Sequence, residues 1–124
     1  MIERRKYPRF ELKLDAKYKI MNSEEILKYG RTRNVSAEGL CFESDEILRP
    51  GVLVELEVDL KDKLPPVYLI GEIRWSQESR ESGPKQKKFV NGVKLIDMPK
   101  SDEGRFLKYY CDRMVEKLSG YLNI

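Results

Sequence analysis

The sequence predicts a mainly β protein: a small six-stranded antiparallel β-barrel followed by a single C-terminal α-helix. Three observations lead to this fold class. Apolar and polar residues alternate with a period of two in several segments, which is typical of half-buried strands. Turn-forming pairs such as Pro50-Gly51 and Pro65-Pro66 separate these segments. Near the C-terminus the apolar spacing becomes helical. A closed barrel leaves no strand edge unpaired, which suits a chain of 124 residues with one core.

The strands are expected in chain order between the turn signals. The segment 26–34 alternates less regularly than the others and is either a strand or a loop that leads into one. The polar segment 76–88 contains Gly83-Pro84 and is expected to be a long mobile loop. Gly92 is expected at a bulge or at a point of close backbone approach. The other strands are expected over residues 12–20, 39–43, 52–60, 67–75 and 89–96.

The last segment has the pattern of an amphipathic helix. Ser101 is expected to cap its N-terminus, ahead of two acidic residues in the first turn, and Gly120 to end it. The apolar residues at helical spacing are Leu107, Tyr110, Cys111, Met114 and Leu118. The whole chain is thus expected to form one stand-alone domain, with a flexible basic arm over 1–10, a barrel over 11–98 and a helix over 99–120.

Composition excludes several classes of protein. There are 24 basic and 21 acidic residues, so the net charge of +3 does not indicate a nucleic-acid coat. Histidine is absent, which excludes Ser-His and Cys-His catalysis and most zinc sites. Cys41 and Cys111 lie among apolar neighbours, and both are expected to be buried thiols of a reducing cytoplasm. No apolar run is long enough for a membrane span, and no signal peptide is expected.

Two short motifs carry candidate chemistry, and the first is the basic arm. Arg5 and Arg9 stand four residues apart, and Arg4 directly precedes them. The planar guanidinium presents a fork of donors that matches a phosphate and also the O6/N7 edge of guanine. Pro8 disfavours a helix here, so the arm is expected to be extended. A solvated basic tail or a nonspecific nucleic-acid arm is the alternative interpretation.

The second motif is Asn34-Val35-Ser36-Ala37-Glu38-Gly39. Asn34 and Ser36 alternate, so in an extended segment their polar groups point to the same side. Each side chain can both donate and accept a hydrogen bond. Gly39 permits a positive φ, which would let the backbone turn sharply beside a ligand. An ordinary β-turn is the alternative.

Together the two motifs resemble the PilZ family, which has an R-x-x-x-R arm followed by [D/N]-x-S-x-x-G. Arg5 and Arg9 match the first motif, and Asn34, Ser36 and Gly39 match the second. The resemblance covers about residues 4–118. It includes Pro50-Gly51, Gly71-Glu72-Ile73-Arg74-Trp75, Gly92-Val93-Lys94-Leu95 and the closing helix. The departures are Asn34, where Asp is common, and Leu95, where Phe is frequent.

This resemblance implies a cytoplasmic bacterial receptor for cyclic di-GMP, with no metal, cofactor or catalytic residue. Arg5 and Arg9 would contact guanine edges and phosphates, and Asn34 and Ser36 would form hydrogen bonds to the ligand. Gly39 would shape the turn. Arg4 implies two stacked ligand molecules per site, because a further guanidinium can bind a second guanine.

The sequence also bears on the position of Trp75 and on how ligand binding could be signalled. Alternation with Val67, Leu69 and Ile73 favours a core position for Trp75, and stacking on a guanine is the alternative. Ligand binding is expected to order the arm and so to signal to an unidentified protein. The chain is expected to be a monomer that neither binds nucleic acid nor enters a membrane. A PilZ-like interaction module without nucleotide binding is the first alternative, and a nucleic-acid-binding barrel the second.

Overall fold

The computed structural model describes residues 10–122. These residues form seven strands and one helix. The elements are β1 (Phe10–Glu11), β2 (Asp15–Ile20), β3 (Lys28–Ser36), β4 (Gly39–Ser44), β5 (Leu53–Val58), β6 (Val67–Glu78), β7 (Phe89–Asp97) and α1 (Lys100–Leu122).

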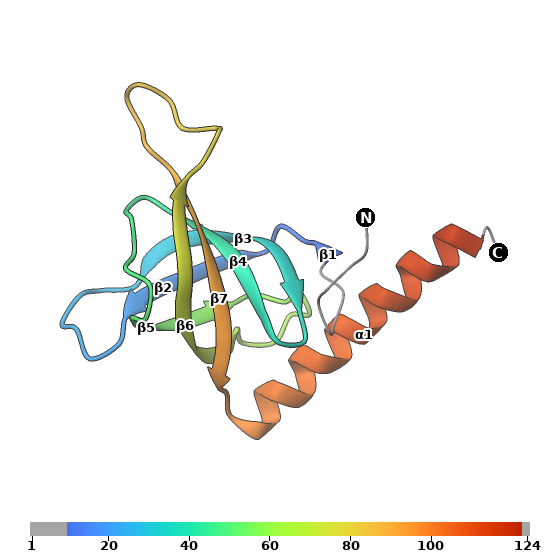
Figure 1. Cartoon of the computed structure of the whole chain (residues 1–124). Helices are drawn as coiled ribbons and strands as arrows, with labels where there is room; N and C mark the ends of the chain where they lie inside the picture. The colour runs from blue at the N-terminus through green and yellow to red at the C-terminus, as the bar shows by residue number, and fades with distance from the viewer. Residues whose placement is uncertain (1–9, 123–124) are drawn as a thin grey trace.

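Six of the strands close into an antiparallel barrel, as the sequence predicts (Figure 1). The strand order is β1-β3-β2-β5-β6-β7-β4, and a further pairing of β3 with β4 joins the two sides. One edge of β3 pairs with β2 along its first half and with the two-residue β1 near its end. The irregular segment 26–34 is thus largely strand, and the short β1 is an element that the sequence pattern did not predict.

The barrel interior is filled by the inward residues of all six strands. On β5 every second residue is fully buried, as the alternation predicts. The rings of Tyr18 and Phe42 pack in a tilted arrangement with their centroids 5.1 Å apart. The core also includes Leu14, Ala16, Val35, Leu40, Val54, Leu56, Val58, Val67, Leu69, Ile73 and Val93.

Helix α1 packs on the barrel through aromatic residues of its first half. Phe106 and Tyr110 are buried there. The backbone N–H of Tyr68 donates to a carboxylate oxygen of Asp102 at 3.0 Å, and Arg105 forms an ion pair with Asp62 at 3.0 Å. The second half of α1 extends beyond the barrel (Figure 1). Among the described residues, no helix is apolar enough over a sufficient length to cross a membrane.

The ends and the packed face of α1 differ from the sequence prediction. The carbonyl of Pro99 accepts the first helical hydrogen bond, from the N–H of Glu103 at 2.8 Å, so Ser101 lies inside the helix and does not cap it. The helix continues past Gly120 to Leu122. The predicted apolar stripe is mostly exposed, because the large rings of Phe106 and Tyr110 set which face meets the barrel. The exposed members of that stripe are Leu107, Cys111 and Leu118.

The prediction for the two cysteines is half right. Cys41 is buried and Cys111 is exposed, and neither forms a disulfide within the described part of the chain. Cys111 was expected to be buried because its neighbours in sequence are apolar, yet it lies on the side of α1 that does not pack on the barrel.

The connection between β6 and β7 is shorter than predicted. Strand β6 continues to Glu78, so the connection covers residues 79–88 and projects from the barrel (Figure 1). Its base is closed by a hydrogen bond from the N–H of Ser79 to the carbonyl of Lys88 at 2.7 Å. Its tip is closed by a hydrogen bond from the N–H of Gly83 to the carbonyl of Gln86 at 2.9 Å. The loop thus has a hydrogen-bonded frame.

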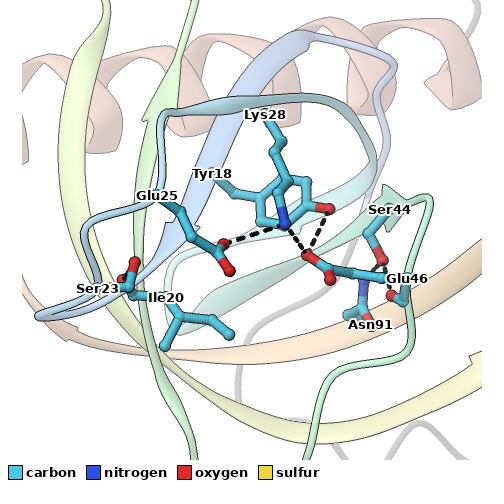
Figure 2. A network of polar contacts seen from close by, with 8 residues as sticks. All are labelled: Tyr18, Ile20, Ser23, Glu25, Lys28, Ser44, Glu46 and Asn91. Carbon is cyan, nitrogen blue, oxygen red and sulfur yellow. Dashed lines mark hydrogen bonds and ion pairs between the residues drawn. The ribbon is translucent and has the colours of Figure 1, made fainter.

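A polar network closes one end of the barrel (Figure 2). The buried amide of Asn91 donates to the Ser44 hydroxyl at 2.9 Å, and the Ser44 hydroxyl donates to the Glu46 carbonyl at 2.6 Å. The Glu46 carboxylate accepts from the ammonium group of Lys28 at 2.7 Å and from the hydroxyl of Tyr18 at 3.4 Å. Burial, followed by the nearby negative charge of Glu46, raises the pKa of Tyr18 to about 12.

This pKa shift predicts a loss of stability at alkaline pH. Below the usual tyrosine pKa of 10.0 the hydroxyl is protonated in both the folded and the unfolded chain. Above it the unfolded chain releases the proton first, so the free energy of unfolding should fall as the pH rises from 10.0 to about 12. Denaturant titrations across this range should show a shallower fall for Tyr18→Phe than for the unmodified protein.

Tyr29→Phe is the matched control, because Tyr29 is an exposed tyrosine. An identical pH slope for Tyr18→Phe and the unmodified protein would contradict the assignment. Tyr68, whose hydroxyl donates to Glu55 at 2.6 Å, also has its pKa raised to about 12. A residual fall is therefore expected in the Tyr18 variant.

Candidate functional site

A single row of residues crosses the outer surface of four neighbouring strands. Asn34 on β3 pairs with Cys41 on β4, Cys41 pairs with Gly92 on β7, and Gly92 pairs with Trp75 on β6. We call these four residues the transverse row. The neighbouring row along the same four strands consists of core residues, whose side chains face the barrel interior. Because successive side chains of a strand alternate between faces, the transverse row faces outward. That inner row is Val35, Leu40, Val93 and Ile73.

Two β-bulges turn the ends of the transverse row outward. On β3, Thr32 pairs with Phe42 and Asn34 with Cys41, so Arg33 is an extra residue. On β6 the register shifts in the same way between Ile73 and Trp75, and the extra residue is Arg74. An extra residue moves every later side chain of a strand to the opposite face.

The second bulge overturns the prediction of a core position for Trp75. Strict alternation from Ile73 would place the indole inside the barrel, but the bulge at Arg74 places it outside, where it is 37% exposed. The next residue, Ser76, points inward, and its hydroxyl donates to the buried Asn91 at 2.7 Å. The tryptophan is therefore available to a ligand.

The centre of the transverse row has little side-chain bulk. A Cβ atom on Gly92 would lie 2.2 Å from Nε1 of Trp75, so the indole lies directly over this glycine. Cys41, on the neighbouring strand, is 2% exposed. Glycine is required at position 92 because the ring occupies the space of a side chain.

The transverse row lies in an open depression of about 680 Å³. The walls come from β3, β6 and the start of the β6–β7 connection. Its lining residues are Arg33, Asn34, Cys41, Trp75, Gln77, Glu78, Ser79, Arg80, Glu81 and Val90. Two arginines face two glutamates, and Arg33 is paired with Glu81 at 3.0 Å. The described lining is therefore close to neutral in charge.

The side chain of Asn34 lines this depression and carries a buried oxygen. Its side-chain oxygen Oδ1 is buried and makes no hydrogen bond within the part of the chain that the structure describes. Buried polar atoms are rarely left without a partner, because the loss of hydration costs about 1–3 kcal/mol. A donor that approaches from the depression would offset this cost.

Ser36 and Gly39 have structural roles in the adjacent turn. Ser36 is buried, and its hydroxyl accepts from the N–H of Glu38 at 3.2 Å and donates to the carbonyl of Gly39 at 3.3 Å. Gly39 does not have the positive φ that the sequence suggested; among the described glycines only Gly51 has one. The reason for glycine at position 39 is steric, since a Cβ would lie 2.1 Å from the carbonyl oxygen of Val93.

The arginines of the arm, Arg4, Arg5 and Arg9, lie outside the described residues. The strand that follows them is described: in β1, Glu11 pairs with Asn34 and Phe10 with Val35. The arm therefore joins the barrel beside the Asn34 end of the transverse row. Sequence reasoning missed Arg33, Arg80 and Val90 as lining residues, and the only available signal was the position of Arg33 next to the Asn34 motif.

The described side chains do not suggest a metal centre. Among the described residues, no group of three or more histidine, cysteine, aspartate or glutamate side chains could hold a metal ion. The depression offers an aromatic face, an amide oxygen without a partner among the described residues, and two guanidinium groups, of which that of Arg33 is paired with Glu81. Together these groups can hold a planar polar ligand.

Comparison with solved structures places this barrel among known folds. The inhibitor of motility MotI/DgrA of Bacillus subtilis matches with a TM-score of 0.70 and 18% identity over 94% of this chain and 54% of its own. MrkH of K. pneumonia, in complex with c-di-GMP, matches with a TM-score of 0.71 and 13% identity over 96% of this chain and 56% of its own. The chain thus spans about half the length of these two proteins.

Two further structures match along nearly their whole length. The PilZ domain of Escherichia coli YcgR, with c-di-GMP, has a TM-score of 0.69 and 11% identity, with 98% of each chain covered. A tetrameric PilZ domain protein of Xanthomonas campestris has a TM-score of 0.65 and 12% identity, with 91% of each chain covered. At these identities the likeness concerns the fold.

Sequence comparison assigns the family. A search of the curated proteins finds no match. The family model described as the PilZ domain matches residues 3–112, which is most of the chain and includes both short motifs. The chain therefore belongs to the PilZ domain family.

Proposed function

We propose that this PilZ domain is a receptor for cyclic di-GMP that binds the dinucleotide across the transverse row and transmits the signal to a protein partner. The observation that carries the proposal is the buried Oδ1 of Asn34, which has no hydrogen-bond partner among residues 10–122 and belongs to a side chain that lines the same depression as an outward-facing Trp75. The family membership and the c-di-GMP complexes of structurally similar proteins support the same ligand.

The depression has the features needed to hold a guanine base. Its volume of about 680 Å³ lies within the range of roughly 300–1,000 Å³ that is usual for small-molecule sites. Asn34 and Trp75 are three strand spacings apart, which is about 14 Å along the sheet at roughly 4.8 Å per strand. One guanine cannot span this distance, so the two guanines of the dinucleotide would divide the contacts: the amino donor of one suits the Asn34 oxygen, and the planar face of the other suits the indole.

The phosphates of the ligand require positive charge that the lining does not supply. Its two arginines are balanced by two glutamates, and Arg33 also lies 3.6 Å from Glu43. The R-x-x-x-R arm is the available source. Arg9 is bonded to the first residue of β1, and Arg5 lies four residues earlier, so Arg5 cannot be more than about 18 Å from Phe10 at roughly 3.6 Å per residue. Both guanidinium groups can therefore reach the transverse row.

The first prediction concerns these arginines. Arg5→Ala and Arg9→Ala should each weaken cyclic di-GMP binding about ten- to a hundred-fold, because each removes charge-assisted hydrogen bonds worth about 1.5–3 kcal/mol. Isothermal titration calorimetry with cyclic di-GMP, GTP and a short single-stranded DNA is the measurement. Lys6→Ala removes the same charge from the same arm outside the motif and should have a much smaller effect.

The outcomes of this titration separate the candidate functions. Selective binding of cyclic di-GMP that depends on Arg5 and Arg9 supports the receptor. Absence of binding by the folded protein would favour an interaction module without a nucleotide ligand. Equal losses for Lys6→Ala and Arg5→Ala, with binding to DNA that weakens steeply with salt, would favour a nonspecific nucleic-acid surface.

A second prediction concerns the position of Trp75. Gly92→Ala places a methyl group where the indole lies and should displace the ring, because the Cβ would be 2.2 Å from Nε1. As Trp75 is the only tryptophan, its fluorescence reports the displacement directly. The affinity for cyclic di-GMP should fall about ten-fold with loss of base stacking, which is worth about 1–3 kcal/mol.

Gly83→Ala is the control for this substitution. Its Cβ would meet only the carbonyl oxygen of Gln86, at 3.9 Å, so neither emission nor affinity should change. Unchanged affinity in a Gly92→Ala protein whose tryptophan emission has shifted would remove Trp75 from the site and leave the rest of the proposal in place.

A further prediction concerns stoichiometry and the response of the arm. We expect two ligand molecules per chain, and one for Arg4→Ala, because Arg4 adds a guanidinium for a second guanine.

Amide hydrogen exchange should slow in residues 2–10 when ligand saturates the protein, since the arm closes over the bound phosphates. Unchanged exchange in this segment would exclude the arm as the signalling element, and one ligand per unmodified chain would exclude the role of Arg4.

A further inference from the structure

One apolar surface of the molecule is not part of the ligand site and lies along α1. Its members are spaced by three and four residues in turn, which is the spacing of a coiled-coil seam. Leu107 and Leu118 are 38% and 53% exposed, and Cys111 between them is also exposed. We call this surface the α1 seam; it consists of Gly104, Leu107, Cys111, Met114 and Leu118, with Val115 beside it.

The barrel leaves Leu107, Cys111 and Leu118 of the α1 seam exposed, whereas Met114 is partly buried. Phe106 and Tyr110 hold a neighbouring side of the helix against the barrel. The second half of α1 extends beyond the barrel, as Figure 1 shows. A helical segment of this length is marginal in water without tertiary contacts, so a partner surface that buries the seam would stabilise it.

Gly104 is a second indication that another helix packs here. It is exposed, and a Cβ at this position would meet no atom within 4 Å. Glycine weakens a helix relative to alanine, so the contacts within this chain do not favour it. A glycine in a seam allows the backbones of two helices to approach closely.

The charges beside the seam match a second copy of the same helix. Glu103 lies on one flank and Lys108 on the other, five residues apart. In a parallel pair of helices, a residue on the first flank meets the residue five positions later on the second flank of the partner. Two symmetric Glu103–Lys108 pairs would form. Lys108 also binds Asp112 of its own helix at 3.0 Å, and an ammonium group has donors for both.

We infer that two copies of this chain associate through their α1 seams as a parallel helix pair. Each barrel packs on a side of α1 that adjoins its seam and would therefore lie beside the pair of helices. The seam and the transverse row have no residue in common. This dimer replaces the expectation of a monomer and does not depend on cyclic di-GMP binding.

Light scattering coupled to size-exclusion chromatography over a range of concentrations tests the association. The unmodified protein should have a mass of about twice 14.6 kDa, and Leu118→Glu should reduce it to 14.6 kDa. Leu64→Glu is the control, because Leu64 is also an exposed leucine, 55% against 53%, and lies outside α1. Circular dichroism should show that both variants are folded.

Oxidation tests the parallel arrangement. In a parallel seam the two Cys111 side chains face each other, so diamide should convert the two thiols into one disulfide by accepting two electrons and two protons. Cys111→Ser should abolish this crosslink, since Cys41 is buried. A monomer at all concentrations, or a dimer that Leu118→Glu leaves intact, would overturn the proposal. A dimer sensitive to Leu118→Glu but not crosslinked would overturn the parallel orientation.

Discussion

Strand β4 is the constraint on which the rest of the molecule depends, because it pairs with β3 on one edge and with β7 on the other and so closes the barrel. The tight approach of β4 and β7 requires Gly39, whose missing side chain leaves space for the Val93 carbonyl. The same two pairings align Asn34, Cys41 and Gly92. The strand pairings that close the barrel are therefore the same pairings that form the transverse row.

Two bulges convert this closed barrel into a candidate binding surface. At Arg33 and at Arg74 the strand gains one residue, and the side chains that follow change faces. Asn34 and Trp75 would otherwise be inward positions, where an amide and an indole would need partners inside the core. The interior has its own polar residues, of which Asn91 is fully hydrogen-bonded to Ser44, Ser76 and the Phe42 carbonyl.

The charge of the molecule is divided in a way that suits a switch. The depression is close to neutral because its lining carries two arginines and two glutamates, whereas the R-x-x-x-R arm carries unbalanced positive charge in the sequence. A ligand with two phosphates can bridge these two parts, and the affinity then depends on both. The α1 seam shares no residue with the lining of the depression, so the proposed self-association and ligand binding use different residues.

The sequence alone determined the barrel, the closing helix, the family and the two motifs, because strand alternation and motif order are local properties. It could not place Trp75, since a bulge depends on the register with a neighbouring strand and reverses a local pattern. It could not show which apolar residues of α1 pack inward, because Phe106 and the Leu107 stripe are equally apolar in sequence. Only the tertiary structure decided these points, by selecting which of several apolar surfaces the barrel can cover.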